Sequence, residues 1–372
     1  MDNIILDKNV SFAKVYQSLN VTATLKEHFE DFIVEENLSV DFSGEGEHCW
    51  IYVKKSGCNT DWVAQQLAFF CGVKKMAVSY AGLKDRNAIT SQWFSVQLPG
   101  KPTPDWTKFE MDFSSNEVKS EVESQTEKVQ VLKSFRHNKK LQRGALKSNS
   151  FKIKLRGLSD TQDKTFELLA QRCEEIAKIG IANYFGEQRF GRNSNNLDQA
   201  AKLFRNPRFK LSKHKRGLYL SAARSWMFNH ILSERIKRDI WNKRVAGDVF
   251  MLDGKSACFK DDGDDQIAQR LFANEIHPTA ILWGEGDVMV TADAAELESQ
   301  VIDQFPVFRD GLISARLQAQ RRACRLKVEN MGNYRENDDF VVSFTLTSGS
   351  YATMVLAEIF SDLVVQSQPT IR

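Results

Sequence analysis

Two runs of alternating bulky residues flank a short polar segment, and this pattern restricts the fold more than any other feature of the chain. The bulky residues on the two sides are Val78, Tyr80, Trp93, Phe94, Val96 and Leu98. Such runs are typical of two β-strands joined by a turn. The turn holds Asp85 between Lys84 and Arg86, two cations that favour an ionised carboxylate if their side chains approach it. Spacing alone favours a polar surface turn, because Gly, Asp and Asn are ordinary turn residues.

The composition is that of a globular protein with room for about two domains. The chain has 372 residues, of which 42% are hydrophobic and 27% are charged, and domains commonly hold about 100–150 residues. Twenty-five Phe and seven Trp residues fill such cores and leave aromatic rings for stacking on bases. The net charge of +3 permits a basic groove without demonstrating one.

Several common chemistries lack their sequence signature. Six cysteines are scattered without a Cys-x-x-Cys pair, and the six histidines show no zinc-ligand spacing, so we expect reduced thiols and no metal or cofactor. Gly254-Lys255-Ser256 is not a phosphate-binding loop, because Val249 stands where that motif needs Gly. Residues 1–7 do not resemble a signal peptide, and no stretch has the roughly 18 apolar residues of a membrane span. We therefore expect a soluble, cytoplasmic protein without a membrane partner.

Helical spacing predicts four prominent helices. They are expected at Asp61–Phe70, at about 160–180, at about Leu220–Trp241, and after Ser350 with Met354, Val355, Ile359 and Leu363 on one face. Residues 244–318 are expected to form short strands and turns. Two basic runs, Arg136–Arg143 and Lys202–Arg216, are either solvated surface or a surface that contacts nucleic-acid phosphates.

Six stretches in this order resemble the TruD family of tRNA pseudouridine synthases. They are Glu30–Glu36 (EDFIVEE), Ala81–Arg86 (AGLKDR), Asn149–Phe151 (NSF), Asn183–Gly191 (NYFGEQRFG), Leu220–Ser225 (LSAARS) and Gly349–Thr353 (GSYAT). Each match is weak alone, but unrelated folds have no reason to keep all six in this order. The matches span nearly the whole chain.

The resemblance implies an α+β fold. A pseudouridine-synthase catalytic domain with a mixed, largely antiparallel central sheet flanked by helices would be built from residues 1–157 and 319–372. A family-specific α+β insertion domain would occupy residues 158–318, with a cleft between the two domains. The implied activity is isomerisation of uridine 13 in the tRNA D-arm to pseudouridine, with tRNA as partner, no cofactor and no obligate protein partner.

The resemblance also assigns residues. Asp85 takes the place of the catalytic Asp, and Phe32, Asn149 and Tyr351 take positions that contact the target base. Further candidates for substrate binding are Phe151, Lys26, Lys84 and Arg86. In this reaction the N-glycosidic bond breaks, the base turns, and it is rejoined through carbon 5. The carboxylate attacks the anomeric carbon, attacks carbon 6, or acts at the 2′ carbon, and the sequence leaves these three routes open.

Two other functions compete with this hypothesis. A non-catalytic protein that binds or folds tRNA could use the same basic surfaces, with Asp85 as a turn residue. A hydrolase of small molecules with an Asp nucleophile is disfavoured, because it gives the basic runs no role.

Overall fold

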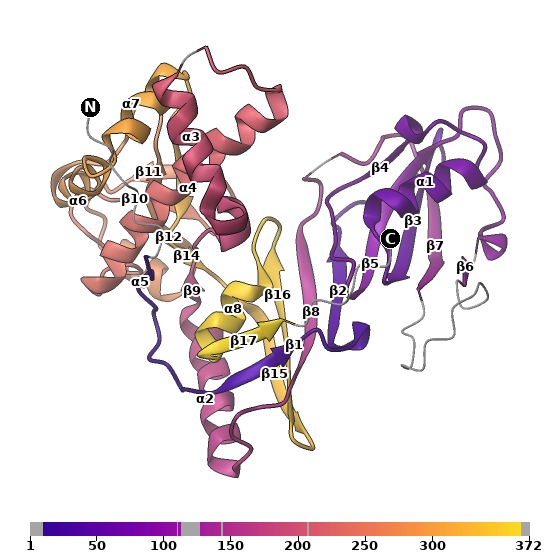
Figure 1. Ribbon diagram of the computed structural model, residues 1–372, viewed down its shortest axis with the longest axis horizontal. Coiled ribbons are helices and arrows are strands. Elements are labelled where there is room, and N and C mark those ends of the chain that lie inside the picture. The colour runs from indigo at the N-terminus through magenta and orange to yellow at the C-terminus, as the bar shows by residue number, and fades with distance from the viewer. Residues whose placement is uncertain (1–9, 110, 113–126, 143, 207, 366–372) are drawn as a thin grey trace. The chain divides into compact units, whose positions relative to one another are not determined.

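The structure, a computed structural model, describes residues 10–109, 111–112, 127–142, 144–206 and 208–365. It consists of two compact units, each assembled from segments that are distant in the sequence (Figure 1). The first, here called the sheet unit, comprises Ser18–Ala177, Val328–Ala352 and Ile359–Arg372. The second, here called the helical unit, comprises Met1–Gln17, Lys178–Lys327 and Thr353–Glu358. Residues 1–7 and Arg143, which the sequence analysis considered, lie outside the described residues.

The sheet unit is built on one large mixed sheet. Its strands are β1 (Thr22–Leu25), β2 (Phe32–Asn37), β3 (His48–Ser56), β4 (Val78–Tyr80), β5 (Ile89–Gln97), β6 (Met111–Asp112), β7 (Lys128–His137), β8 (Ser148–Arg156), β15 (Glu329–Glu336), β16 (Asp339–Thr347) and β17 (Asp362–Val365). Among the described residues the main order is β15-β16-β8-β2-β5-β3-β7-β6, while β4 pairs with β5 and β1 with both β8 and β17. Only β2–β5 and β1–β17 are parallel within this described sheet. The predicted α+β class with a largely antiparallel sheet is therefore confirmed.

Helix α1 (Thr60–Phe70) covers part of this sheet, and its sequence explains its packing. Of the two residues that could cap it, Asn59 and Thr60, Asn59 occupies the N-cap with an extended backbone, but its side chain makes no capping hydrogen bond. Val63 and Leu67 are fully buried against Ile51 of β3 and Phe94 of β5. Burial of each such side chain contributes about 1.5–3 kcal/mol. The unit also contains α2 (Asp163–Ile179), which extends to its boundary.

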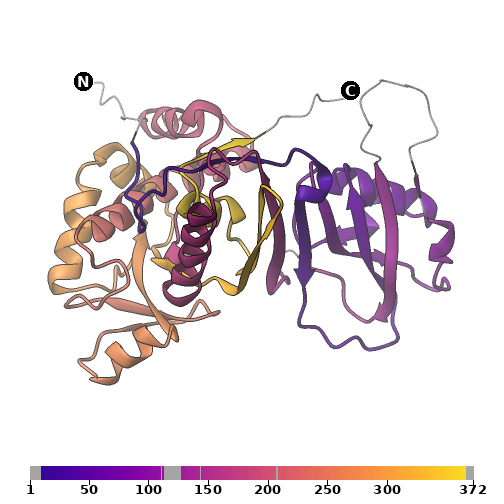
Figure 2. The same cartoon turned by 90° about the horizontal axis from the view of Figure 1, so that it is seen from below.

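The helical unit packs three of its described helices, α3, α6 and α7, against α4. Its helices are α3 (Asn195–Arg205), α4 (Lys213–Lys237), α5 (Gln266–Phe272), α6 (Ala292–Ile302) and α7 (Pro306–Ser314), with most of α8 (Ala352–Ile359). Its strands are β9 (Ile181–Ala182), β10 (Val249–Leu252), β11 (Cys258–Lys260), β12 (Ile276–Leu282), β13 (Gln320–Ala323) and β14 (Arg325–Leu326). An N-terminal segment joins this core, since Phe12 stacks on Tyr184 and meets Trp226 edge-on, both at 5.4 Å between ring centroids. Figure 2 shows this indigo segment beside the pink and orange elements of the unit.

Three predictions about helices are wrong in detail. Helix α4 begins at Lys213 rather than near Leu220, because the Ser212 side chain accepts a hydrogen bond from the Lys215 amide and caps it. Residues 244–318 hold α5, α6 and α7 in addition to strands. The last helix ends at Ile359, and Leu363 instead lies in β17, where it pairs with Ala23 of β1.

Candidate active site

Asp85 lies in the loop between β4 and β5, and buried side chains form hydrogen bonds with the backbone of that loop. The Gly82 carbonyl accepts a hydrogen bond from Gln92 Nε2 at 3.3 Å. The Lys84 amide donates to Thr60 Oγ1 at 3.0 Å, and Thr60 Oγ1 in turn donates to Gln92 Oε1 at 2.9 Å. Because Thr60 and Gln92 are buried, these contacts give the loop a defined conformation.

The Asp85 carboxylate is half exposed and has a cation beside it. Its side chain is 53% exposed, and Oδ2 accepts a hydrogen bond from Lys26 Nζ at 2.8 Å. The same ammonium group lies 4.1 Å from the centroid of the Phe32 ring, a cation–π contact. Lys26 has a left-handed backbone, with φ of +63°, which costs a non-glycine residue about 1–2 kcal/mol. This strained residue connects Asp85 to Phe32.

The two cations next to Asp85 in the sequence pair with other carboxylates. Lys84 Nζ lies 2.7 Å from Glu36 Oε1. Arg86 donates from Nη2 to Glu127 Oε1 and from Nε to the Gly57 carbonyl, both at 2.8 Å. The expectation that Lys84 and Arg86 would be the cations beside the Asp85 carboxylate is therefore replaced by the Lys26 contact. The Lys84 side chain is only 9% exposed and points inward to Glu36.

Glu36 and Asn149 lie on the same face of the sheet, opposite one another on β2 and β8. The Glu36 side chain is fully buried, and its Oε2 accepts a hydrogen bond from the Trp93 amide at 2.8 Å. Burial raises the pKa of Glu36, while the Lys84 ammonium opposes that shift. Asn149 is also buried, and its Oδ1 has no hydrogen-bond partner among the described residues. A buried acceptor of this kind calls for an explanation, and a bound ligand is one.

Two aromatic side chains continue this face. Phe151 lies opposite Val34 in the register of β8 and β2. The Phe32 and Phe151 rings meet edge-on with centroids 6.2 Å apart, and Phe151 also contacts Phe344 at 5.4 Å. Contacts thus connect Asp85 to Phe151 through Lys26 and Phe32.

Tyr351 reaches the same end of the sheet by a different route. It is half buried and follows β16, in which Leu346 lies opposite Asn149. The Ser348 amide donates to the Lys147 carbonyl at 3.2 Å, which keeps this segment next to the start of β8. The chain path therefore links Tyr351 to Asn149, whereas contacts link Lys26, Phe32 and Phe151 to Asp85.

Sequence reasoning missed two buried charges below the loop, Glu36 and Lys55. Lys55 is fully buried and donates from Nζ to the carbonyls of Asp85 at 2.9 Å and Cys58 at 2.8 Å. Burial lowers the pKa of Lys55 to about 8. Each of the two follows a residue of the same charge in its strand: Glu36 follows Glu35, and Lys55 follows Lys54. Since neighbours in a strand point to opposite faces, one member of each pair had to point inward.

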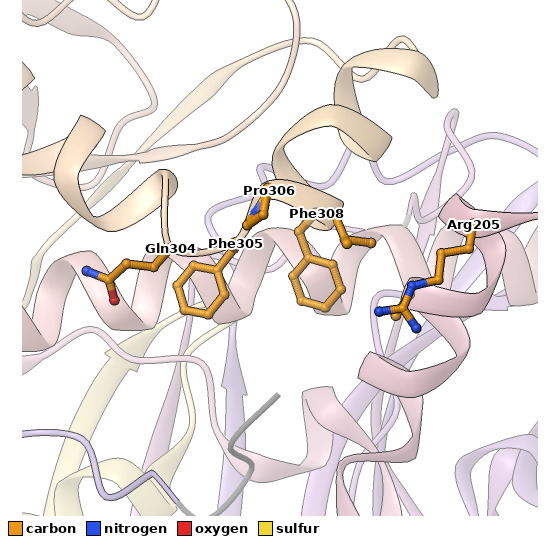
Figure 3. A pocket seen from close by; sticks show the side chains of 7 residues that line it. Arg205, Gln304, Phe305, Pro306 and Phe308 are labelled. Atoms are coloured by element: carbon orange, nitrogen blue, oxygen red, sulfur yellow. The ribbon is translucent and has the colours of Figure 1, made fainter. Parts of the chain in front are cut away.

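The rest of the described chain presents no metal site and no membrane span. No cluster of three or more His, Cys, Asp or Glu residues there could hold a metal ion. None of its helices combines the length and apolar character needed to cross a membrane. A small apolar hollow in the helical unit runs between Arg205 and Gln304, with Phe305 and Phe308 along it (Figure 3). It contains none of the predicted site residues.

The basic run that starts at Arg136 begins inside a strand rather than in a loop. Arg136 belongs to β7, and its guanidinium donates to Thr103 Oγ1 at 2.9 Å and to the Lys101 carbonyl at 2.6 Å. These hydrogen bonds connect β7 to the loop after β5, so this arginine has a structural role.

Comparison with known proteins identifies the family. The family model described as tRNA pseudouridine synthase D (TruD) matches residues 13–204 and 195–359. The chain belongs to the TruD family. It is 44% identical to the tRNA pseudouridine synthase D of Methylococcus capsulatus, over 89% of this chain and 88% of that protein. For the same enzyme of Hydrogenovibrio crunogenus the identity is 40%, over 94% of this chain and 96% of that one.

A solved structure supports the fold. The putative tRNA pseudouridine synthase D of Methanosarcina mazei matches with a TM-score of 0.67 and 22% sequence identity, over 94% of this chain and 96% of that one. At this identity the match speaks for the fold alone. The resemblance inferred from the six sequence stretches is confirmed.

Proposed function

We propose that this protein isomerises uridine 13 in the D-arm of tRNA to pseudouridine, and that Asp85 is the catalytic carboxylate. One observation carries the proposal: in a chain of the TruD family, Asp85 is accessible on an anchored loop and paired with Lys26 at 2.8 Å. The ion pair holds the carboxylate in place, and the exposed part of the side chain leaves room for a sugar and a base. The enzyme would act in the cytoplasm, where tRNA is used.

The reaction conserves the atoms of the nucleotide. The bond between the anomeric carbon and N1 breaks, the uracil turns, and a bond from the anomeric carbon to C5 replaces it. The hydrogen on C5 leaves as a proton, and N1 gains one. Asp85 either attacks the anomeric carbon, attacks C6, or acts at the 2′ carbon, and each route needs an ionised carboxylate near the sugar.

The detached uracil must be retained between the two steps. Phe32 and Phe151 provide aromatic surface for it, and stacking on an aromatic side chain contributes about 1–3 kcal/mol per base. The unpartnered Asn149 Oδ1 suits the N3–H of uracil as an acceptor. Tyr351 is proposed as a further contact to the base. Lys84 and Arg86 act below the loop, through their pairs with Glu36 and Glu127, rather than by direct contact with the base.

The two units are proposed to have different roles in the enzyme. The sheet unit, which includes Asp85, is proposed as the catalytic domain, and the helical unit as the family-specific insertion. The central segment of the helical unit runs from Lys178 to Lys327, whereas the sequence predicts an insertion from residue 158 to residue 318. The start of α4 presents Lys213, Lys215 and Arg216 as exposed cations, which suit the phosphates of tRNA.

Release of tritium from tRNA labelled at C5 of uridine tests this function, because only isomerisation exchanges that hydrogen. We expect release by the wild-type protein and none above background by Asp85→Asn, with tRNA affinity changed by less than about threefold. Asp338→Asn is the matched control, since its exposed side chain lies in the β15–β16 turn, and it should release tritium normally. Tight tRNA binding without release by the wild-type protein would favour a non-catalytic tRNA-binding protein.

A further inference from the structure

The loop that carries Asp85 also exposes an apolar side chain. Leu83 is 70% exposed, although it lies only two residues from the proposed catalytic carboxylate. The intervening Lys84 side chain is only 9% exposed, and Asp85 is 53% exposed. This alternation places Leu83 and Asp85 on the outward side of the loop and Lys84 on the inward side.

Leu83 is exposed on a backbone that is fixed on both of its sides. The Gly82 carbonyl is held by Gln92 and the Lys84 amide by Thr60, through side chains that are buried. Single exposed leucines are common on protein surfaces. This one differs because the buried contacts on both sides fix the loop backbone in a conformation that leaves the Leu83 side chain in solvent.

We propose that Leu83 is a wedge that enters the RNA base stack at the place vacated by the target uridine. The proposal rests on the proposed function, because an enzyme that works on a base inside folded RNA must first take it out of the stack. Apolar side chains, leucine among them, insert between stacked bases in other nucleic-acid complexes. The Cα atoms of residues two positions apart lie within about 7 Å of one another in any conformation, a reach of about two stacking steps of 3.4 Å.

The geometry gives the two exposed side chains separate tasks. Asp85 faces the sugar of the extruded nucleotide, while Leu83 contacts the bases that remain stacked. Leu83 is then a positioning residue: it stabilises the extruded state and takes no part in bond breaking. Its removal should slow the reaction on folded RNA and spare the reaction on a uridine that is already unstacked.

The test compares two substrates and three variants in single-turnover tritium release. The substrates are a folded tRNA transcript and a short unstructured oligonucleotide that carries the same target uridine. Unstacking costs a few kcal/mol, so Leu83→Ala should slow release from the tRNA by about 10-fold or more and leave release from the oligonucleotide within about twofold of wild type. Leu83→Met keeps an apolar chain and should restore most of the rate. Phe69→Ala is the matched control, because Phe69 is 84% exposed on α1, and it should behave as wild type.

A second readout needs no turnover. In the Asp85→Asn background, 2-aminopurine placed next to the target uridine should brighten when the protein binds and extrudes the base, and much less when Leu83 is also replaced by Ala. The wedge proposal would be overturned if wild type and Leu83→Ala release tritium from folded tRNA at equal rates, or if Leu83→Ala loses the same rate on both substrates. It would also be overturned if 2-aminopurine brightens equally with and without Leu83. If the wild-type protein releases no tritium from either substrate, the proposed function fails, and the fluorescence change alone then decides on Leu83.

Discussion

Removal of the Lys84 ammonium should destabilise the sheet next to the active-site loop, because the buried Glu36 carboxylate loses its ion-pair partner and keeps only the weaker attraction of Lys55. In Lys84→Met the Glu36 carboxylate, whose side chain is fully buried, loses a cation at 2.7 Å and keeps the hydrogen bond from the Trp93 amide. Loss of one partner of a buried pair costs about 3–5 kcal/mol, out of a typical total stability of about 5–15 kcal/mol. The local opening of β2 and β5 should therefore become much easier.

The size of this effect can be measured by hydrogen–deuterium exchange in the peptide that contains Trp93. When reclosing is fast, each 1.4 kcal/mol lost speeds exchange about tenfold. A loss of about 3–5 kcal/mol should therefore make the amide that donates to Glu36 exchange about 100- to 4,000-fold faster in Lys84→Met. A local probe is preferable to whole-chain unfolding, because a chain of two units need not unfold in one step.

The pH dependence separates a charge effect from a packing effect. Burial already raises the pKa of Glu36, and loss of Lys84 raises it further. When the pKa of an acid is higher in the folded state than in the unfolded state, the folded state binds more protons between the two pKa values. The folded protein then regains stability as pH falls through the folded pKa towards the unfolded pKa. The defect of Lys84→Met should thus be largest near pH 8 and shrink near pH 5, and Glu36→Gln combined with Lys84→Met should remove most of it. A defect below about 1 kcal/mol, or one that does not change with pH, would refute this reasoning.

The remaining predictions concern Lys26, Lys55 and Asn149. Lys26→Met should slow single-turnover tritium release about 10-fold, because it removes the hydrogen-bond partner of Asp85. This factor corresponds to the weaker charge-assisted hydrogen bonds, since the carboxylate is half exposed. An unchanged rate would contradict this prediction. The pKa of Lys55 is about 8 in the folded protein against an ordinary value of 10.5. The unfolded state then binds more protons between these values, so Lys55 adds stability as pH rises from 8 to 10.5. The urea midpoint of wild type should rise across that window relative to Lys55→Met, and parallel curves would refute the assignment. Asn149→Leu removes a buried acceptor without a partner among the described residues, so it should lower the release rate while the urea midpoint stays level or rises; a matching loss of stability would make Asn149 structural.

Local signals in the sequence were enough for much of the fold. The β4–β5 hairpin and α1 were predicted because the alternation of bulky residues and the 3–4 spacing of Val63, Leu67 and Phe70 are patterns of only a few neighbouring positions. Helix α7 was missed although Pro306 opens it at its first turn, a known start signal. It is nine residues long and lies in a stretch punctuated by turn residues, so its helical periodicity is short.

The sequence predicted which residues belong to the candidate site better than it predicted the contacts between them. Resemblance supplied Asp85 and Phe32, but the nearest charges in the sequence were not the partners of Asp85 in space. Lys84 alternates inward to Glu36, and Lys26 approaches Asp85 from a segment 59 residues earlier. Such pairing is set by the register of β2 against β5 and β8, which no local pattern specifies.

The most direct test of the account is to map pseudouridine at position 13 of tRNA in cells. A strain that lacks this protein would be complemented with wild type, Asp85→Asn or Asp338→Asn, and its tRNA would be treated with carbodiimide and read by primer extension. The account predicts a stop at uridine 13 with wild type and Asp338→Asn and its absence with Asp85→Asn at equal protein levels. A full stop restored by Asp85→Asn would contradict the central role of this carboxylate.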